Sequence, residues 1–112
     1  MKKFLSVIAG SLFFLSVTVF AEEHLNAALE HANAAVTEGK AGSAPKLAVH
    51  AKAALDHSLA ASLVAKSVSK NHIDAASKSL QQAIDHAALS HVQPATKASE
   101  EAVTHLSAAK KQ

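Results

Sequence analysis

Polar and apolar positions divide the chain into an apolar leader and a domain with regularly spaced apolar residues. After Lys2 and Lys3, a mostly apolar run covers residues 4–20. Beyond it, apolar residues recur every three, four or seven positions. That spacing places them on one face of an α-helix. The pattern therefore predicts an all-α domain behind an N-terminal leader.

Gly39 and Pro45 divide the first half of this domain into two predicted helices. We expect Gly39 to end a helix over residues 23–38, because glycine accepts the left-handed conformation that follows many helices. Proline suits the first position of a helix, where its missing N–H costs nothing. A second helix is therefore predicted from Pro45 to about Ser69.

Two further signals set the helices of the second half. Asn71 is a suitable N-cap for a third helix, so we place the break between the halves at residues 70–71. A turn near residues 89–93 should follow that helix. Pro94 then marks the start of a fourth helix, which is predicted to continue to about Ala109.

The first hairpin is repeated 48 residues later in the chain. Under this shift histidines fall on histidines at two positions, and aliphatic residues fall on aliphatic residues. The domain, residues 22–112, is therefore predicted to contain two tandem helical hairpins, about 22–69 and 70–112. They are expected to close into an up-down-up-down four-helix bundle.

The leader has the form of an export signal. A basic start precedes the apolar run, and Val19-Phe20-Ala21 fits a signal-peptidase site with cleavage after Ala21. The run is short for a membrane span, and no other segment could cross a bilayer. We therefore expect residues 1–21 to be removed and the exported domain to stay off the membrane; retention of the leader as an anchor is the alternative.

The composition of residues 22–112 argues against several functional classes. Nine lysines balance nine acids, and arginine and aromatic residues are absent, so nucleic-acid binding is not expected. Without cysteine, the domain has neither a disulfide nor a thiolate metal site. No nucleophile elbow, His-Glu-x-x-His motif or glycine-rich phosphate loop is present, so an enzyme is not predicted. Alanine dominates, which predicts a thin core.

Histidine is the main source of candidate chemistry. Within each helix the histidines are seven or fourteen residues apart, so they lie along one helix edge. Each directly precedes a position on the expected core-facing stripe, which places it beside the core. The eight candidate metal ligands are His24, His31, His50, His57, His72, His86, His91 and His105.

Their numbering predicts that the histidines face each other in pairs. Residues at the same level of an antiparallel hairpin have numbers with a constant sum, and four combinations satisfy this condition. These are His24/His57, His31/His50, His72/His105 and His86/His91. Two neutral imidazoles suit Cu(II), Ni(II) or Zn(II), although water, a carboxylate or another pair must complete the site. Pairs about 10 Å apart along the axis should form separate sites. Alternatively, each ring simply packs over alanine.

Three segments resemble the small metal-binding protein (SmbP-like) family. They are HANAAVTEGKAG at 31–42, VHAKAALDH at 49–57, and LQQAIDH at 80–86 with His91-Val92 following. The resemblance implies a periplasmic four-helix bundle whose repeated histidines, here all eight, bind several divalent metals, Cu(II) prominently, in buffering or tolerance. The family tends to have histidine at four positions where this chain does not, which are Glu38, Ser43, Ser79 and Ala98.

Together, these features predict a periplasmic, non-enzymatic protein that binds divalent metal ions through histidine pairs. Cu(II) is the favoured metal, with Ni(II) and Zn(II) as alternatives, and the sequence does not identify any protein partner. The competing hypothesis is a structural or interaction bundle with no dedicated metal role. Its histidines would form a pH-sensitive row between helices.

Overall fold

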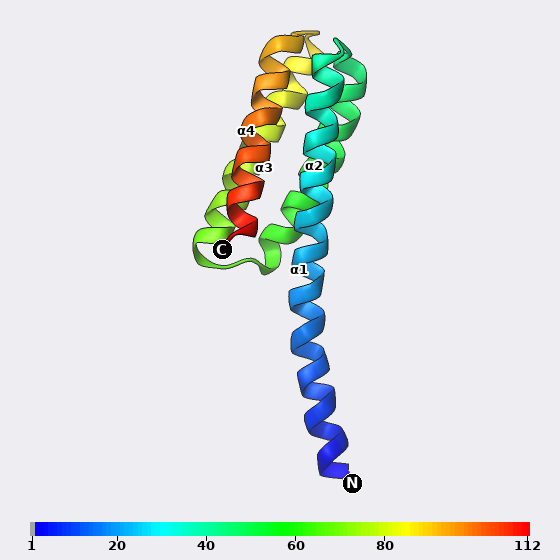
Figure 1. Ribbon diagram of the computed structural model, residues 1–112, viewed down its shortest axis with the longest axis vertical. Helices are drawn as coiled ribbons and strands as arrows, with labels where there is room; N and C mark the ends of the chain where they lie inside the picture. Colours follow the sequence, from blue (N-terminus) through cyan, green and yellow to red (C-terminus); the bar gives the residue numbers. More distant parts are fainter. Residues whose placement is uncertain (1) are drawn as a thin grey trace.

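The computed structural model describes the backbone of residues 2–112 and the side chains from Val19 onward. Four helices follow one another along the chain: α1 (Lys2–Lys40), α2 (Ala44–Val64), α3 (Ser67–Ala88) and α4 (Val92–Lys110). Consecutive helices pack side by side in opposite directions, and α4 returns to pack on α1 (Figure 1). The predicted all-α, up-down-up-down bundle of two hairpins is confirmed.

Helix α1 is longer than the sequence pattern predicted. It begins at Lys2 instead of residue 23 and ends at Lys40 instead of residue 38. No glycine or proline lies between residues 11 and 38, so nothing interrupts the helix where the domain was expected to start. The predicted export signal falls mostly on residues 1–18, whose side chains lie outside the described part. In that described part, no helix has a stretch both long and apolar enough to span a bilayer.

The first hairpin turn depends on Gly42, whose φ of 86° lies in the left-handed region. The Ser43 N–H donates to the Glu38 carbonyl at 2.9 Å, and the Gly42 N–H donates to the Gly39 carbonyl at 3.0 Å. These two bonds satisfy carbonyls that the helix end would leave free. The prediction that Gly39 ends the helix was therefore wrong, because the left-handed residue comes three positions later.

Gly39 serves close packing between helices. A Cβ at this position would collide with the Thr96 hydroxyl of α4 and would lie 2.8 Å from Leu47 Cδ1 of α2. Only a residue without a side chain lets these helices approach so closely. Glycine at this position therefore fixes the distance of α1 from two neighbours.

The second hairpin repeats this turn without glycine. Ser90, 48 residues after Gly42, has φ 59°, and the His91 N–H donates to the His86 carbonyl at 2.9 Å. Helix α4 then begins at Val92, two residues before the predicted start at Pro94. Pro94 lies in the first turn of the helix, where its missing N–H has no intrahelical acceptor.

We expect Ser90→Gly to stabilise the protein by about 1 kcal/mol, because glycine adopts the left-handed conformation without the Cβ penalty. Thermal unfolding followed by circular dichroism would measure the gain. Ser43→Gly is the matched control, since Ser43 has φ −101° and its hydroxyl accepts a hydrogen bond from the Lys46 N–H. A loss at both positions would show that Ser90 is not strained.

The connection between the hairpins differs most from the prediction. Helix α2 ends at Val64 and α3 begins at Ser67, so the break precedes residues 70–71 and Asn71 lies inside α3. A polar cluster spans the connection: the Ser62 hydroxyl donates to Asp74 at 2.5 Å, and the Lys70 ammonium donates to Asp74 at 2.7 Å. The bonds from Lys70 and then Ser62 hold the pKa of Asp74 below its usual value. These contacts keep Lys70 in the first turns of α3.

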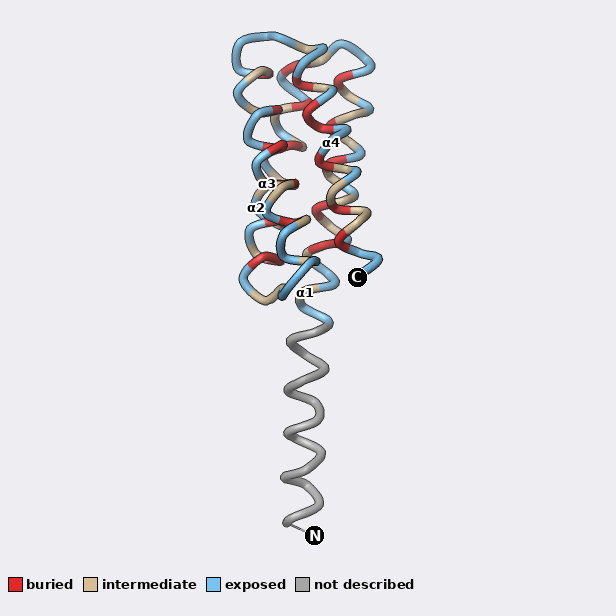
Figure 2. The backbone as a smooth tube through the Cα atoms, turned by 90° about the vertical axis from the view of Figure 1, so that its left-hand side faces the viewer, coloured by how far each residue is buried: buried red, intermediate tan, exposed pale blue. Residues whose placement is uncertain are grey.

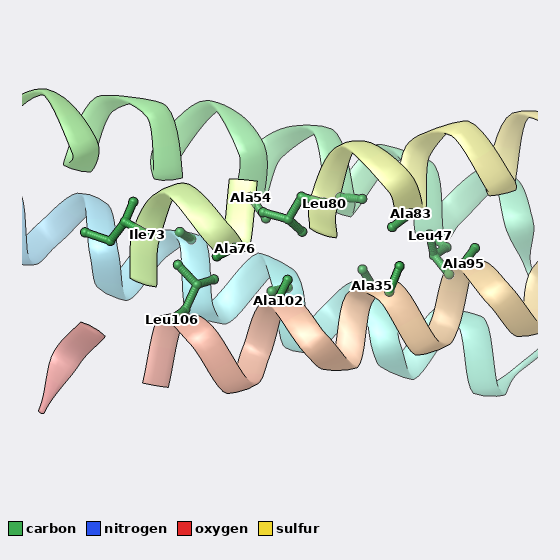
Figure 3. Packing of buried hydrophobic residues seen from close by; sticks show 14 of the residues in the cluster. Ala35, Leu47, Ala54, Ile73, Ala76, Leu80, Ala83, Ala95, Ala102 and Leu106 are labelled. Carbon is green, nitrogen blue, oxygen red and sulfur yellow. The ribbon is translucent and has the colours of Figure 1, made fainter. Parts of the chain in front are cut away.

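Alanine occupies most buried positions of the core. Buried residues form one inward-facing line along each helix (Figure 2). The largest aliphatic side chains among them are spread along the bundle, with Leu47, Leu80, Ile73 and Leu106 at different levels (Figure 3). Because alanine fills little volume, neighbouring helices can pack closely and residues at their edges face each other at short range.

Candidate metal centre

The histidines of each hairpin lie where its two helices meet. Seven of them are partly buried, and His91 is exposed at the start of α4. The residues that follow them are buried, except for the partly buried Val92. Because the next residue points into the core, each histidine lies at the edge of the helix interface. The spacing of seven residues repeats this position along the same edge. The predicted core-facing stripe is confirmed at these positions.

In the first hairpin the two predicted pairs are direct neighbours. His24 Nδ1 lies 2.9 Å from His57 Nδ1, with ring centroids 5.1 Å apart. His31 Nδ1 lies 3.4 Å from His50 Nδ1, with centroids 5.7 Å apart. Two neutral imidazoles at this range can share one proton, with one nitrogen donating and the other accepting. A metal ion in the same place would be bound by a lone pair from each nitrogen.

These two pairs are joined into one row of rings. His31 and His57 stack at 5.8 Å with an interplanar angle of 6°. Helical side chains lean toward the N-terminus of their own helix, so in antiparallel α1 and α2 these two rings lean toward each other. The rings of successive pairs are therefore in contact in this hairpin, while separate metal sites stay a prediction. The contact could have been predicted from the sequence, because two antiparallel helices lean their side chains in opposite directions.

The second hairpin keeps its pairs apart. The rings of His72 and His105 have centroids 6.0 Å apart, and those of His86 and His91 are 6.2 Å apart. Between them, Ser79 and Ala98 occupy the positions equivalent to a histidine pair, and both are buried. Their small side chains let α3 and α4 pack closely at this level. No imidazole lies there, so the two histidine pairs stay separate.

Acidic residues do not complete these pairs. In the described residues, no three histidine, aspartate or glutamate side chains converge to hold a metal ion. Glu23, beside His24, and Glu101, one turn before His105, are both exposed. Each pair therefore offers two nitrogen ligands and leaves the remaining coordination positions to water or to a neighbouring ring.

The nitrogen separations in the first hairpin are compatible with metal coordination. Two nitrogens that are each about 2.05 Å from one metal lie about 2.9 Å apart at a right angle and about 3.3 Å apart at a tetrahedral angle. The measured separations are 2.9 Å for His24/His57 and 3.4 Å for His31/His50. Neither pair needs a backbone movement to bring its two nitrogens to these distances.

Comparison with known proteins places the chain in a family. A search of curated proteins found no match. By contrast, the sequence model of the family described as "Small metal-binding protein" matches residues 1–109, nearly the full chain. The family is named for metal binding and not for a catalysed reaction. This match, which confirms the resemblance seen in the sequence, shows that the chain belongs to the small metal-binding protein family.

Proposed function

We propose that the exported domain binds divalent metals, Cu(II) foremost, through its histidine pairs, and that it buffers metal or confers tolerance to it in the periplasm. The observation that carries this proposal is the Nδ1–Nδ1 separation of 2.9 Å in one pair and 3.4 Å in another. Family membership supports metal binding in general. The proposed ligands are His24, His31, His50, His57, His72, His86, His91 and His105.

The preference for Cu(II) rests on ligand type and number. Neutral imidazoles bind Cu(II) most strongly among the first-row divalent ions, and a tetragonal ion accepts two nitrogens at a right angle with water in its other positions. A structural Zn(II) site normally takes four protein ligands in a closed tetrahedron, which these pairs do not supply. Ni(II) and Zn(II) are expected to bind more weakly at the same pairs.

Several incomplete sites are better suited to buffering than to holding one resident cofactor. Four pairs lie along the edges of two hairpins, at the protein surface, and seven of their eight rings are partly exposed. A metal with open coordination positions can exchange with solvent ligands without unfolding the bundle. The proposed role is therefore non-enzymatic storage and release of the ion.

The second candidate function is a structural bundle that responds to pH. The same close pairs favour it, because two protonated imidazoles at 2.9 Å would repel each other. In that case the rings would serve to loosen the bundle in acid and would have no dedicated metal role. Metal titration separates the two functions.

The proposed function predicts that metal binding depends on both members of a pair. Calorimetry of residues 22–112 at pH 7.5 with Cu(II), Ni(II) and Zn(II) should show several sites, with Cu(II) tightest. His31→Ala and His50→Ala should each weaken one site on the order of a hundred-fold, because two linked ligands gain 10²–10⁴ over single ones. The double variant should be little worse than either single variant.

A matched control combines histidines from different hairpins. His31→Ala with His105→Ala should give additive losses, because these two side chains belong to different pairs. Additive losses for His31 and His50 as well would contradict the pairing. If none of the three metals binds the unmodified domain, the pH-sensitive structural bundle becomes the better explanation.

A further inference from the structure

The predicted cleavage after Ala21 gives His24 a special position. The mature chain would begin Glu22-Glu23-His24, so a free amine would stand two residues before a histidine. This arrangement places four nitrogens in sequence: the amine, two backbone amides and the imidazole Nδ1. Cu(II) and Ni(II) favour a square plane of nitrogen ligands. Fused chelate rings along one short peptide supply such a plane without help from the fold.

The helix geometry shows how cleavage would free the two amides. Within α1, the N–H groups of Glu23 and His24 face the carbonyls four residues earlier, those of Val19 and Phe20. Removal of residues 1–21 takes these acceptors away. Both amides would then be among the first N–H groups of a helix, which have no intrahelical partner. They become available to lose a proton to solvent and bind a metal.

The side chains around the new terminus permit the same change. Glu22 and Glu23 are exposed, whereas Leu25 is buried at 8% exposure and anchors the helix in the core. Residues 22–24 can therefore leave the helical conformation at a small cost in free energy, because helix ends fray readily. The Phe20 ring now packs against His24 at a centroid distance of 4.3 Å, edge to face. Cleavage removes this contact and uncovers the imidazole.

We propose that leader removal creates an amino-terminal chelate for Cu(II) or Ni(II), formed by the Glu22 amine, the amide nitrogens of Glu23 and His24, and His24 Nδ1. Metal binding releases the two amide protons, and also the ammonium proton when the amine is protonated. The inference rests on the cleavage included in the proposed function, but it does not depend on metal binding by the histidine pairs.

His57 connects this chelate to the rest of the protein. Its Nδ1 lies 2.9 Å from the His24 Nδ1 that the chelate requires. A Cu(II) ion bound at His24 would therefore be close to His57. Through the His31–His57 stack, the terminal site would adjoin the row of rings in the first hairpin. The chelate and that row would together form an unbroken series of nitrogen ligands along the first hairpin.

Ni(II) titration of two proteins tests the proposal. One begins at Glu22, and the matched control keeps Ala21, which moves His24 to the fourth position and leaves all eight histidines in place. Ni(II) bound to the first should be square-planar and diamagnetic, with sharp proton resonances and a yellow colour. The tightest Ni(II) site of the control should be on the order of a hundred-fold weaker and paramagnetic, since it loses the linked donors.

Two variants and one mass measurement complete the test. In the Glu22 protein, His24→Ala should abolish the diamagnetic complex and His57→Ala should preserve it. Identical Ni(II) spectra from the Glu22 and Ala21 proteins would overturn the proposal, even if both bind metal at the pairs. Diamagnetic Ni(II) in the Glu22 protein alone would support it, even if the pairs bind nothing. The exported chain should have the mass of residues 22–112; a different start would overturn the site's formation in the cell.

Discussion

Saturating Cu(II) is expected to raise the melting temperature of residues 22–112 by at least about 10 °C at pH 7.5. A ligand that binds only the folded state at a hundred times its dissociation constant stabilises by about 2.7 kcal/mol per site. For a domain of this size, each 1 kcal/mol raises the melting temperature by about 4–8 °C. An alanine-rich core leaves the apo bundle modestly stable, so the relative gain is large.

Helical circular dichroism through a melt, with and without Cu(II), measures this effect. The gain should fade near pH 5, because protons compete with metal for imidazole nitrogens as the pH falls. A variant with His24, His31, His50 and His57 replaced by glutamine is the matched control, and it should lose at least half of the gain. An unchanged midpoint at saturating Cu(II) would show that metal binding is not coupled to folding.

Gly39→Ala is expected to destabilise the bundle by roughly 2 kcal/mol. Alanine improves helix propensity by about 1 kcal/mol, but overpacking a close contact costs about 1–3 kcal/mol or more. The new methyl group would meet Thr96 and Leu47, and part of the Thr96 contact is its Cβ at 2.9 Å, which cannot rotate away. Separation of α1 from α4 would relieve the collision at the expense of the nearby core.

Urea unfolding followed by circular dichroism would measure the loss. Gly42→Ala is the control in the same turn, because nothing lies within 4 Å of a Cβ there and only its φ of 86° resists the substitution. That variant should lose about 1 kcal/mol through backbone strain alone. The variant Gly39→Ala with Thr96→Gly should recover stability relative to Gly39→Ala. Without such recovery, the close approach of α1 and α4 is not what requires glycine.

Much of the candidate site could be predicted from residue numbers because helices are regular. A seven-residue spacing fixes the edge on which a histidine lies, and antiparallel packing fixes the level at which it meets a partner. The rings of His24 and His57, and those of His31 and His50, are accordingly neighbours. The contact of His31 with His57 depends on the opposite lean of side chains from two helices, which spacing along one helix does not contain.

The helix ends were predicted less well, because capping residues and glycines stand at more than one position near each end. Asn71 is a good N-cap, yet α3 starts at Ser67. Bonds of Ser62 in α2 to Lys70 and Asp74 in α3 link the two helices across the connection between the hairpins. Glycine likewise has two possible roles at a helix end. Gly42 has the left-handed backbone, and Gly39 has the close neighbours from α2 and α4.

Residue spacing alone predicts the all-α class, the two repeated hairpins and the facing histidines, because each depends on periodicity along regular helices. The leader and its cleavage after Ala21 remain predictions from local composition. The row of four rings in the first hairpin is seen only in the tertiary structure, where His31 stacks on His57. This stack forms because the two side chains lean toward each other across the interface of α1 and α2, which alanine-rich packing keeps narrow.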